Sequence, residues 1–437
     1  MNRIALRALL LLMLVLLATG VALVRESALH AAMAAHPTVE IVKTDKGYEL
    51  RRNGQPYFIK GAAGNGSKQL LKEDGGNSMR TWSADGADAD YAEANHYGLT
   101  MTQGIWLGHK DQGFDYHNLW QVWSQYFSVR QQVLRLKDQP ALLMWGLGNE
   151  MEAWGMEKDP SPVVWQNIEA MAKMMKHLDP NHPIMVAVKD ITNGNIEALH
   201  HYCPDVDIVG INSYDGWDTL AQRYRAHGGT KPYILSEFGP YGPWTYPWKK
   251  NSWGALSEPS STQKATLYED AYRACAADPL CLGSYAFLWG SKQEISATWF
   301  GMFLPDGAKL GAVDAMAEMW GQKSPHPAPE ILDISVREGA RVAPGALVHA
   351  ELKAANRGHD PLDVDWVLQS DVIEPSSDGF VQPPPTHPEA IVAFNIRRAV
   401  VRMPQSEGAY RLYAYIHNRH GGAAVANVPL FVVRVPK

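Results

Sequence analysis

The chain has 437 residues, of which 46% are hydrophobic and 10% aromatic, so it can bury a large core and is long enough for two folded units. Its formal net charge is −6, and loss of residues 1–34, which carry three arginines and one glutamate, would leave −8. This acidic balance argues against a nucleic-acid partner and favours a substrate that is neutral or held by local contacts.

The first residues have the pattern of an export signal. Arg3 and Arg7 precede an apolar stretch at residues 8–24, and residues 32–34 read Ala-Met-Ala, which fits an A-x-A cleavage site. We therefore expect residues 1–34 to be removed and the protein to be periplasmic or secreted. An uncleaved anchor remains the alternative, because 17 apolar residues lie at the short end of a membrane span. The protein would then face outside the cytoplasm, and this segment would be its sole membrane contact.

Residues 37–322 form the first predicted domain, and from residue 57 onward they repeat one theme, in which a short apolar run is followed by a polar loop and an amphipathic helical stretch. The candidate strands are residues 57–62, 78–82, 99–105, 142–150, 183–189, 207–214, 233–239 and 283–290. Eight strands with two apolar faces, alternating with helices, predict an α/β fold of the (β/α)8 TIM barrel type. A doubly wound open sheet is the alternative, but no G-x-G-x-x-G follows the first strand.

Two flanking features complete the predicted barrel. Alternating runs around an "NGQP" turn, before the first barrel strand, predict a hairpin that covers the barrel floor. Four tryptophans lie in the helical stretches, and we expect them to belong to the core. They are Trp120, Trp123, Trp165 and Trp320.

The pattern changes after the barrel. Three prolines at residues 323–330 indicate a linker, and residues 331–437 contain short alternating strands with almost no helical pattern. This composition predicts a small all-β sandwich.

The chain has three cysteines. Cys275 and Cys281 flank a short loop that could close as a disulfide in an oxidising compartment, and two buried free thiols are the equal alternative. Cys203 would then be unpaired. No Cys/His cluster has the spacing of a zinc site, so we expect no metal and no cofactor.

Active residues of such barrels lie at the carboxyl ends of the strands, and two glutamates meet this criterion. Glu150 ends the fourth candidate strand and Glu237 ends the seventh. These strands lie on opposite sides of the ring, so the two carboxylates can face each other across the mouth. Glycoside hydrolysis needs one carboxyl group that is protonated and one that is ionised. Glu152, two residues further on, is the rival acid, but we expect it to be a solvated loop residue.

Other strand ends carry side chains suited to support this pair. Arg80 ends the second strand and could keep a carboxylate ionised, and Tyr214 near the end of the sixth could donate a hydrogen bond to it. Trp289 ends the eighth strand, where an indole could form the floor under a sugar ring. Trp244 and Trp248, in the tryptophan-rich loop after strand seven, are further candidates for glycan contacts.

At these strand ends the sequence resembles a known group of enzymes. "NSMRTW", "LLMWGLGNE", "INSYDGW" and "KPYILSEFG" are similar to the corresponding segments of clan A glycoside hydrolases, nearest to the catalytic barrel of family 2, the family of β-galactosidases and β-glucuronidases. The resemblance covers roughly residues 38–322 and is specific as a set. The sandwich resembles Ig-like or fibronectin-like modules.

The resemblance implies roles for individual residues. Glu150 would be the acid/base, Glu237 the nucleophile, and Asn149 a contact to the sugar 2-hydroxyl. Arg80 and Tyr214 would support the nucleophile, and Trp289 would be the aromatic platform. His109, just past the third strand, is a looser match to a sugar-contacting position.

The expected function is a retaining glycoside hydrolase that acts on β-linked glycans by double displacement. The family normally carries a sugar-binding jelly roll and an Ig-like domain ahead of the barrel, whereas some twenty residues separate the predicted signal from the first strand here, so the family's exo specificities cannot be assumed. The tryptophan-rich loop points instead to an oligo- or polysaccharide substrate of the β-glucan type. Transglycosylation by the same mechanism and a non-catalytic envelope glycan-binding protein are the alternatives.

Overall fold

The computed structural model describes residues 38–152, 162–192, 194–244, 250–356, 361–371 and 383–434. The predicted export segment and Trp248 lie outside these ranges. Within them, no helix has both the length and the apolar character needed to cross a membrane.

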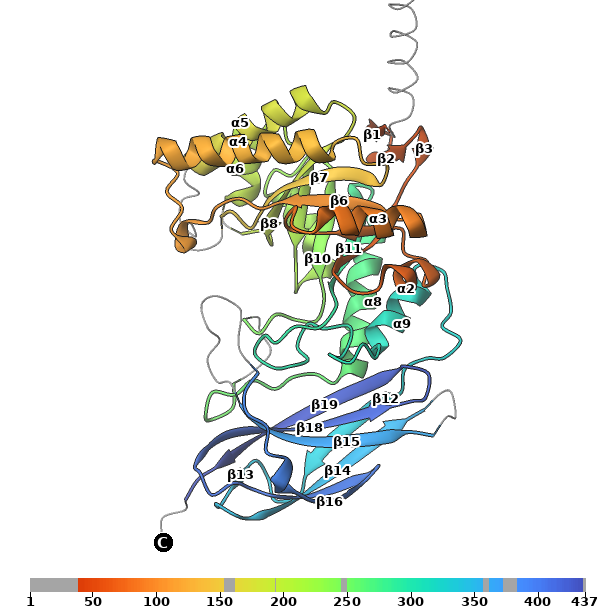
Figure 1. Cartoon of the computed structure of the whole chain (residues 1–437), viewed down its shortest axis with the longest axis vertical. Coiled ribbons are helices and arrows are strands. Elements are labelled where there is room, and N and C mark those ends of the chain that lie inside the picture. Colours follow the sequence, from red (N-terminus) through yellow and green to blue (C-terminus); the bar gives the residue numbers. More distant parts are fainter. Residues whose placement is uncertain are drawn as a thin grey trace, which may run out of the picture.

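The barrel consists of eight parallel strands that close in the order β10-β11-β4-β5-β6-β7-β8-β9, which is chain order around the ring (Figure 1). The strands are β4 (Ile59–Gly64), β5 (Ser78–Arg80), β6 (Thr100–Ile105), β7 (Leu142–Asn149), β8 (Ile184–Lys189), β9 (Ile208–Asn212), β10 (Tyr233–Phe238) and β11 (Cys281–Trp289). Each candidate strand corresponds to one of them, and the predicted TIM barrel is confirmed. Most strand residues are buried on both faces, which explains their near-continuous apolar runs.

Helices cover the outside of the ring. They are α2 (Lys68–Glu73), α3 (Ala87–Tyr97), α4 (Leu119–Leu136), α5 (Pro162–Leu178), α6 (Asn195–Tyr202), α7 (Trp217–Ala226), α8 (Ser261–Ala277) and α9 (Gly311–Met319), with a 3-10 turn at Lys110–Gln112. The buried positions of α5 recur at helical spacing, as the sequence predicts.

A small antiparallel sheet precedes the barrel and is formed by β1 (Val39–Lys43), β2 (Tyr48–Arg52) and β3 (Gln55–Pro56). Its main chain bonds to the carbonyls of Asn181 and Pro279, and the Arg52 guanidinium bonds to that of Pro140. These three residues come just before β8, β11 and β7. The sheet therefore lies against the amino ends of the strands, opposite the expected active-site rim.

The C-terminal region forms an all-β sandwich, as predicted. One sheet has the order β12-β14-β17-β16 and the other β13-β19-β18-β15. The strands are β12 (Glu330–Val336), β13 (Arg341–Val342), β14 (Leu347–Ala355), β15 (Asp363–Ser370), β16 (Ile391–Asn395), β17 (Arg398–Arg402), β18 (Gly408–His417) and β19 (Ala423–Val432), with a 3-10 turn at Pro388–Ala390. Val348 and Val401 of the first sheet and Leu412 and Leu430 of the second belong to one buried core.

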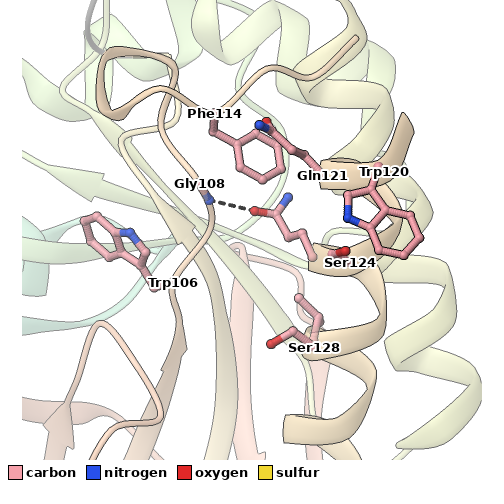
Figure 2. A pocket seen from close by; sticks show the side chains of 9 residues that line it. Trp106, Gly108, Phe114, Trp120, Gln121, Ser124 and Ser128 are labelled. Carbon is pink, nitrogen blue, oxygen red and sulfur yellow. Dashed lines mark hydrogen bonds between the residues drawn. The ribbon is translucent and has the colours of Figure 1, made fainter. Parts of the chain in front are cut away.

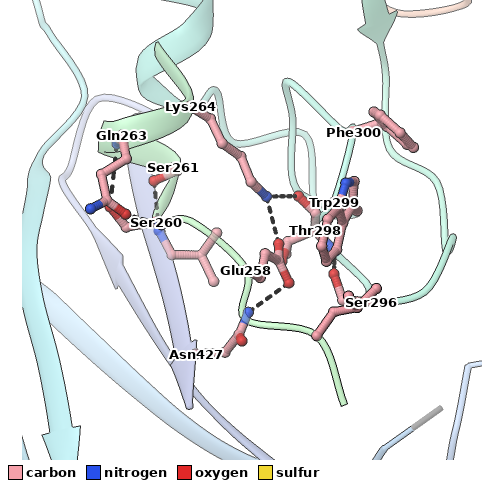
Figure 3. A network of polar contacts seen from close by, with 12 residues as sticks. Glu258, Ser260, Ser261, Gln263, Lys264, Ser296, Thr298, Trp299, Phe300 and Asn427 are labelled. Atoms are coloured by element: carbon pink, nitrogen blue, oxygen red, sulfur yellow. Dashed lines mark hydrogen bonds and ion pairs between the residues drawn. The ribbon is translucent and has the colours of Figure 1, made fainter. Parts of the chain in front are cut away.

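Barrel and sandwich meet along α8, which lies beside β12 and β19 in Figure 1. Figure 3 shows the polar network at this contact. Glu258 and Lys264 form a buried ion pair at 2.5 Å, and Asn427 of the sandwich donates to the second oxygen of Glu258 at 2.7 Å. The main-chain N–H of Val425 donates to Ser261 at 3.0 Å. Side chains of both units thus satisfy one another's buried polar groups.

Two expectations about individual residues are resolved by the fold. Cys275 and Cys281 are joined by a disulfide, and Cys203 is a buried free thiol. Trp165 and Trp320 are buried, as expected for core residues, but Trp120 and Trp123 are 72% and 58% exposed. The expectation that all four are core residues is therefore wrong for the two on α4.

Candidate active site

Glu237 lies near the end of β10 and is held by three donors. Arg80 and Trp82 donate to its Oε1 at 2.8 and 2.7 Å, and Tyr214 donates to its Oε2 at 2.7 Å. Arg80 is 2% exposed and also donates to the carbonyl of Ser236 at 2.9 Å. Both carboxylate oxygens therefore receive hydrogen bonds, and the bond from the Arg80 guanidinium is charge-assisted.

Glu150 follows β7 in a left-handed backbone conformation with φ of 50°. This conformation is uncommon for a residue with a side chain, and it costs on the order of 1 kcal/mol or more. The N–H of Glu150 donates to the carbonyl of Ala187 in β8 at 2.8 Å, which secures the turn. Its Oε1 accepts a hydrogen bond from Asn212 at 2.8 Å.

Asn149 links the two carboxylates through shared partners. Its Oδ1 accepts from Arg80 at 2.7 Å and from Asn212 at 3.1 Å. Since Arg80 also contacts Glu237 and Asn212 also contacts Glu150, one continuous network joins both glutamates. The side-chain oxygen of Asn149 faces this network, so its amino group is directed away from it.

The two glutamates differ in their electrostatic surroundings. Burial, and secondly the negative charge of Glu237, raise the pKa of Glu150 to about 7, although the hydrogen bond from Asn212 opposes the shift. Burial and the neighbouring Glu237 carboxylate raise the pKa of Tyr214 well above its usual value, so this phenol remains a proton donor. The site thus holds one carboxyl group that can be protonated near neutrality and one that is surrounded by donors.

Aromatic rings surround Tyr214 and the donors to Glu237. Phe287 lies 5.7 Å from Trp82 and 5.8 Å from Tyr214 between ring centroids. Phe300 lies 5.2 Å from Tyr214 and Trp244 lies 5.8 Å from it. Trp244 is 58% exposed, so it contributes an open aromatic surface beside the carboxylates.

Trp289 does not have the position expected of a sugar platform. Its side chain is fully buried, packs against Phe303 and Trp320, and donates to the carbonyl of Ser67 at 3.0 Å. The pairing of β11 with β4 shifts register between Phe287 and Trp289, and this shift turns Trp289 away from the barrel mouth. Phe287 is the β11 aromatic that faces the site.

His109 is not brought to the carboxylates by any contact among the described residues. It is buried, its ring lies 4.9 Å from that of Trp106, and burial lowers its pKa. Glu152 is also buried and accepts hydrogen bonds from the N–H of Lys189 and from Asn195, so the expectation of a solvated loop residue is wrong. These bonds anchor the loop above β7 to the end of β8.

Sequence reasoning missed two contributors to the site, Trp82 and Asn212. Asn212 is the last residue of β9, so the strand-end criterion that selected Glu150 would also have selected it. Trp82 is the last residue of the candidate strand at residues 78–82, so the same criterion would have selected it as well, although β5 itself ends at Arg80.

Comparison with known proteins agrees with this geometry. Residues 90–268 match the family model described as "Glycosyl hydrolases family 2, TIM barrel domain". No curated protein matches the sequence. A calcium-binding mutant of β-glucuronidase 2 from Bacteroides uniformis is structurally similar, with a TM-score of 0.51, 16% identity, and coverage of 90% of this chain and 48% of that one.

Two other solved structures are also similar to this chain. The β-glucuronidases of Ruminococcus gnavus and Dictyoglomus thermophilum each have a TM-score of 0.49 and 18% identity. The match to the first covers 65% of this chain and 52% of that one, and the match to the second covers 66% and 54%. The chain therefore spans about half the length of these neighbours, and the likeness concerns the fold.

The closed barrel carries two carboxyl groups at its mouth, and one hydrogen-bond network joins them. Residues 90–268 of this barrel are similar to the TIM barrel domain of glycosyl hydrolases family 2.

Proposed function

We propose that the protein is a retaining β-glycosidase with Glu237 as nucleophile and Glu150 as acid/base. The observation that carries this proposal is the contrast between the two carboxyl groups. Glu237 accepts from Arg80, Trp82 and Tyr214, whereas Glu150 has a pKa raised to about 7. An ionised nucleophile and a protonated acid on one site are what double displacement requires.

In the first step, a Glu237 oxygen attacks the anomeric carbon and the bond to the leaving oxygen breaks. Glu150 gives its proton to that oxygen, and a glycosyl ester forms on Glu237. In the second step, the ionised Glu150 takes a proton from water, which attacks the anomeric carbon and releases Glu237. The sugar leaves with its original anomeric configuration. The amino group of Asn149, directed away from the network, is suited to contact the sugar 2-hydroxyl.

We further propose an extended, neutral β-glucan as substrate. Trp244 offers an exposed ring next to Tyr214, and sugar rings stack on such surfaces. The guanidinium of Arg80 is already occupied by Glu237, Asn149 and Ser236, so it is poorly placed to hold a sugar carboxylate. The structural neighbours named above are β-glucuronidases, so a β-glucuronide is the anionic sugar with which the neutral substrate should be compared.

The test uses purified protein with aryl β-glucoside, β-galactoside and β-glucuronide, and with soluble β-glucans. We expect turnover of a β-glucoside or β-glucan with first release of the β-anomer, as followed by NMR. Glu237→Gln should lower kcat by ~10⁴-fold or more, because the nucleophile is lost. Equal turnover by this variant would contradict the assignment of Glu237.

The same experiment separates the remaining alternatives. Longer oligosaccharides among the products would indicate transglycosylation by the same two residues. If no substrate in the panel is turned over while β-glucan still binds, the protein is a glycan-binding protein. Preferred turnover of the β-glucuronide would overturn the neutral-substrate proposal without affecting the mechanism.

We also propose that the protein acts outside the cytoplasm. The export pattern of residues 1–34 supports this location, and so does the bond between Cys275 and Cys281, since such bonds persist in oxidising compartments. Fractionation of cells that express the full chain, followed by detection in the periplasm or medium, tests the location; retention in the cytoplasm would contradict it.

A further inference from the structure

The first half of α4 carries an aromatic surface that the fold does not use. Trp120, Trp123 and Phe127 are 72%, 58% and 47% exposed. Their rings stack in sequence, with centroid distances of 5.7 Å and 5.8 Å. The buried residues of α4 are Val129, Val133 and Leu136, on the opposite face of its second half. Exposed aromatic rings of this kind mark binding surfaces more often than structural ones, and of these three residues Trp120 lines the pocket described next, whereas Trp123 and Phe127 do not.

A pocket of about 460 Å³ lies between this surface and the loop after β6 (Figure 2). Its nine lining residues are Trp106, Gly108, Phe114, Trp120, Gln121, Ser124, Gln125, Ser128 and Val129. Trp106, on the loop after β6, and Trp120, on α4, both line the pocket and lie at opposite sides of the view in Figure 2. Trp106 is 42% exposed.

The remaining lining residues supply neutral hydrogen-bonding groups. Gln121, Ser124, Gln125 and Ser128 recur at helical spacing on α4 and form one polar stripe. The amide oxygen of Gln121 accepts from the N–H of Asp115 at 2.7 Å, and that of Gln125 accepts from the N–H of Gly108 at 2.6 Å. These bonds fix the orientation of both amides. None of the nine lining residues is charged.

The pocket lies close to the catalytic rim. Trp106 directly follows β6, and β6 stands in the barrel between β5, which carries Arg80, and β7, which leads into Glu150. Because the carboxyl ends of parallel strands meet at one rim, a chain bound at the glutamates can continue over the end of β6.

We propose that the pocket between Trp106 and Trp120 is an accessory glycan-binding site that holds a neutral stretch of the polysaccharide substrate. Two indoles offer apolar faces to sugar rings, the glutamine and serine stripe offers partners for hydroxyl groups, and the lack of charge favours a neutral sugar over a uronic acid. The role as a substrate site rests on the proposed glycosidase function.

The test is affinity electrophoresis of the full chain in native gels that contain mixed-linkage β-glucan, galactan or dextran, with polygalacturonate as the charged comparison. The Glu237→Gln background prevents degradation of the polymer. We expect at least one neutral polymer to retard the protein, and Trp106→Ala and Trp120→Ala each to weaken this binding by 10-fold or more. Ser124→Tyr, which fills the pocket and leaves both indoles in place, should have the same effect.

Phe127→Ala is the matched control, because Phe127 is an exposed aromatic residue of the same helix that does not line the pocket. It should bind as the parent does. No retardation by any neutral polymer, or equal weakening by Phe127→Ala, would overturn the proposal, and the second result would indicate a general apolar docking surface. Turnover of an aryl β-glycoside by the otherwise unaltered chain tests the catalytic proposal separately, since this reaction requires no bound polymer.

Discussion

The three donors to Glu237 come from two places in the barrel, the end of β5 (Arg80 and Trp82) and the segment after β9 (Tyr214), and two of them can be removed with little change of shape. Tyr214→Phe deletes the hydroxyl group that donates to Oε2, and its ring can keep its contacts with Phe287 and Phe300. Loss of one hydrogen bond to a charged group costs about 1.5–3 kcal/mol, so we expect kcat to fall roughly 10- to 100-fold.

Trp82→Phe, which removes the donor to Oε1, should act in the same way. Steady-state kinetics with an aryl β-glycoside measures both effects, and a change confined to KM would argue that these residues contact the substrate rather than the nucleophile. Tyr410→Phe, in the sandwich, is the matched control and should leave kcat unchanged, because the Tyr410 hydroxyl bonds to the carbonyl of Ser406.

The raised pKa of Glu150 has consequences for both activity and stability. The first chemical step needs protonated Glu150, so kcat/KM should fall as pH rises above about 7. The folded-state pKa exceeds the ordinary value of 4.5, so the contribution of this group to stability is fully present below pH 4.5 and is lost as pH rises through 7.

Glu150→Gln removes this titration. Near pH 4 the variant should be as stable as the parent. At pH 8 its free energy of unfolding should be higher than that of the parent by about 1–3 kcal/mol, and urea unfolding at both pH values measures the difference. The basic limb of the kcat/KM profile should also disappear, at a much lower rate. If the stability of the parent relative to the variant is the same at pH 4.5 and pH 7, folding does not raise the pKa of Glu150.

At the scale of elements, the barrel strands were predictable because each is a short apolar run bounded by loops. Strand ends then selected Arg80, Glu150, Tyr214 and Glu237, and the family resemblance added Asn149. Trp289 was misplaced for a physical reason. Side chains alternate between the two faces of a regular strand, and the register shift in β11 interrupts this alternation. The shift depends on how β11 pairs with β4, which the sequence of β11 alone does not reveal.

The tryptophans of α4 illustrate a different limit. Val129, Val133 and Leu136 are spaced as one buried face, and continuing this period toward the amino end passes through residues 122, 125 and 126 rather than Trp120 or Trp123. The spacing of the buried residues therefore predicts that both tryptophans lie outside the buried face of α4. Hydrophobicity alone assigned them to the core, because an exposed tryptophan is uncommon unless it serves binding.

Helix α8 begins with a complete capping box. Ser260 accepts from the N–H of Gln263 and Gln263 accepts from the N–H of Ser260, and the Ser260 hydroxyl also donates to the carbonyl of Ile331 in β12. Ser260→Ala should lower the free energy of unfolding by about 1–2 kcal/mol. Ser260→Asn, which restores a capping oxygen, should recover part of the loss in urea unfolding. Equal stability of Ser260→Ala and the parent would mean that tertiary contacts alone hold this helix start.

For the whole molecule, the presence of two folded units was predictable from the change of pattern near residue 323, but their mode of contact was not. The contact depends on polar residues that are far apart in the chain, such as Glu258 and Asn427, and neither belongs to a periodic pattern. Arg411 adds to it from β18, with bonds to Asp371, Asn427 and the carbonyl of Leu256. Such partners become evident only when both units are folded and in place.

This buried contact should make barrel and sandwich unfold as one unit. Glu258→Ala leaves the ammonium group of Lys264 buried without its carboxylate, which typically costs about 3–5 kcal/mol, and leaves Asn427 without its acceptor. Replacement of Lys264 by Met in the same chain removes the unpaired charge, so the double variant should be more stable than Glu258→Ala alone. Glu351→Ala, which breaks only exposed ion pairs of the sandwich, should change stability by less than about 1 kcal/mol.

Calorimetry distinguishes the outcomes, because a coupled molecule gives one transition and an uncoupled one gives two. We expect one transition for the parent and for Glu351→Ala. In Glu258→Ala we expect a separate transition at lower temperature, because the weakened contact no longer couples the unfolding of the two units. Two transitions in the parent would show that the sandwich does not support the barrel. A double variant no more stable than Glu258→Ala would show that the loss comes from Asn427 and the main chain around it, and not from the buried charge of Lys264.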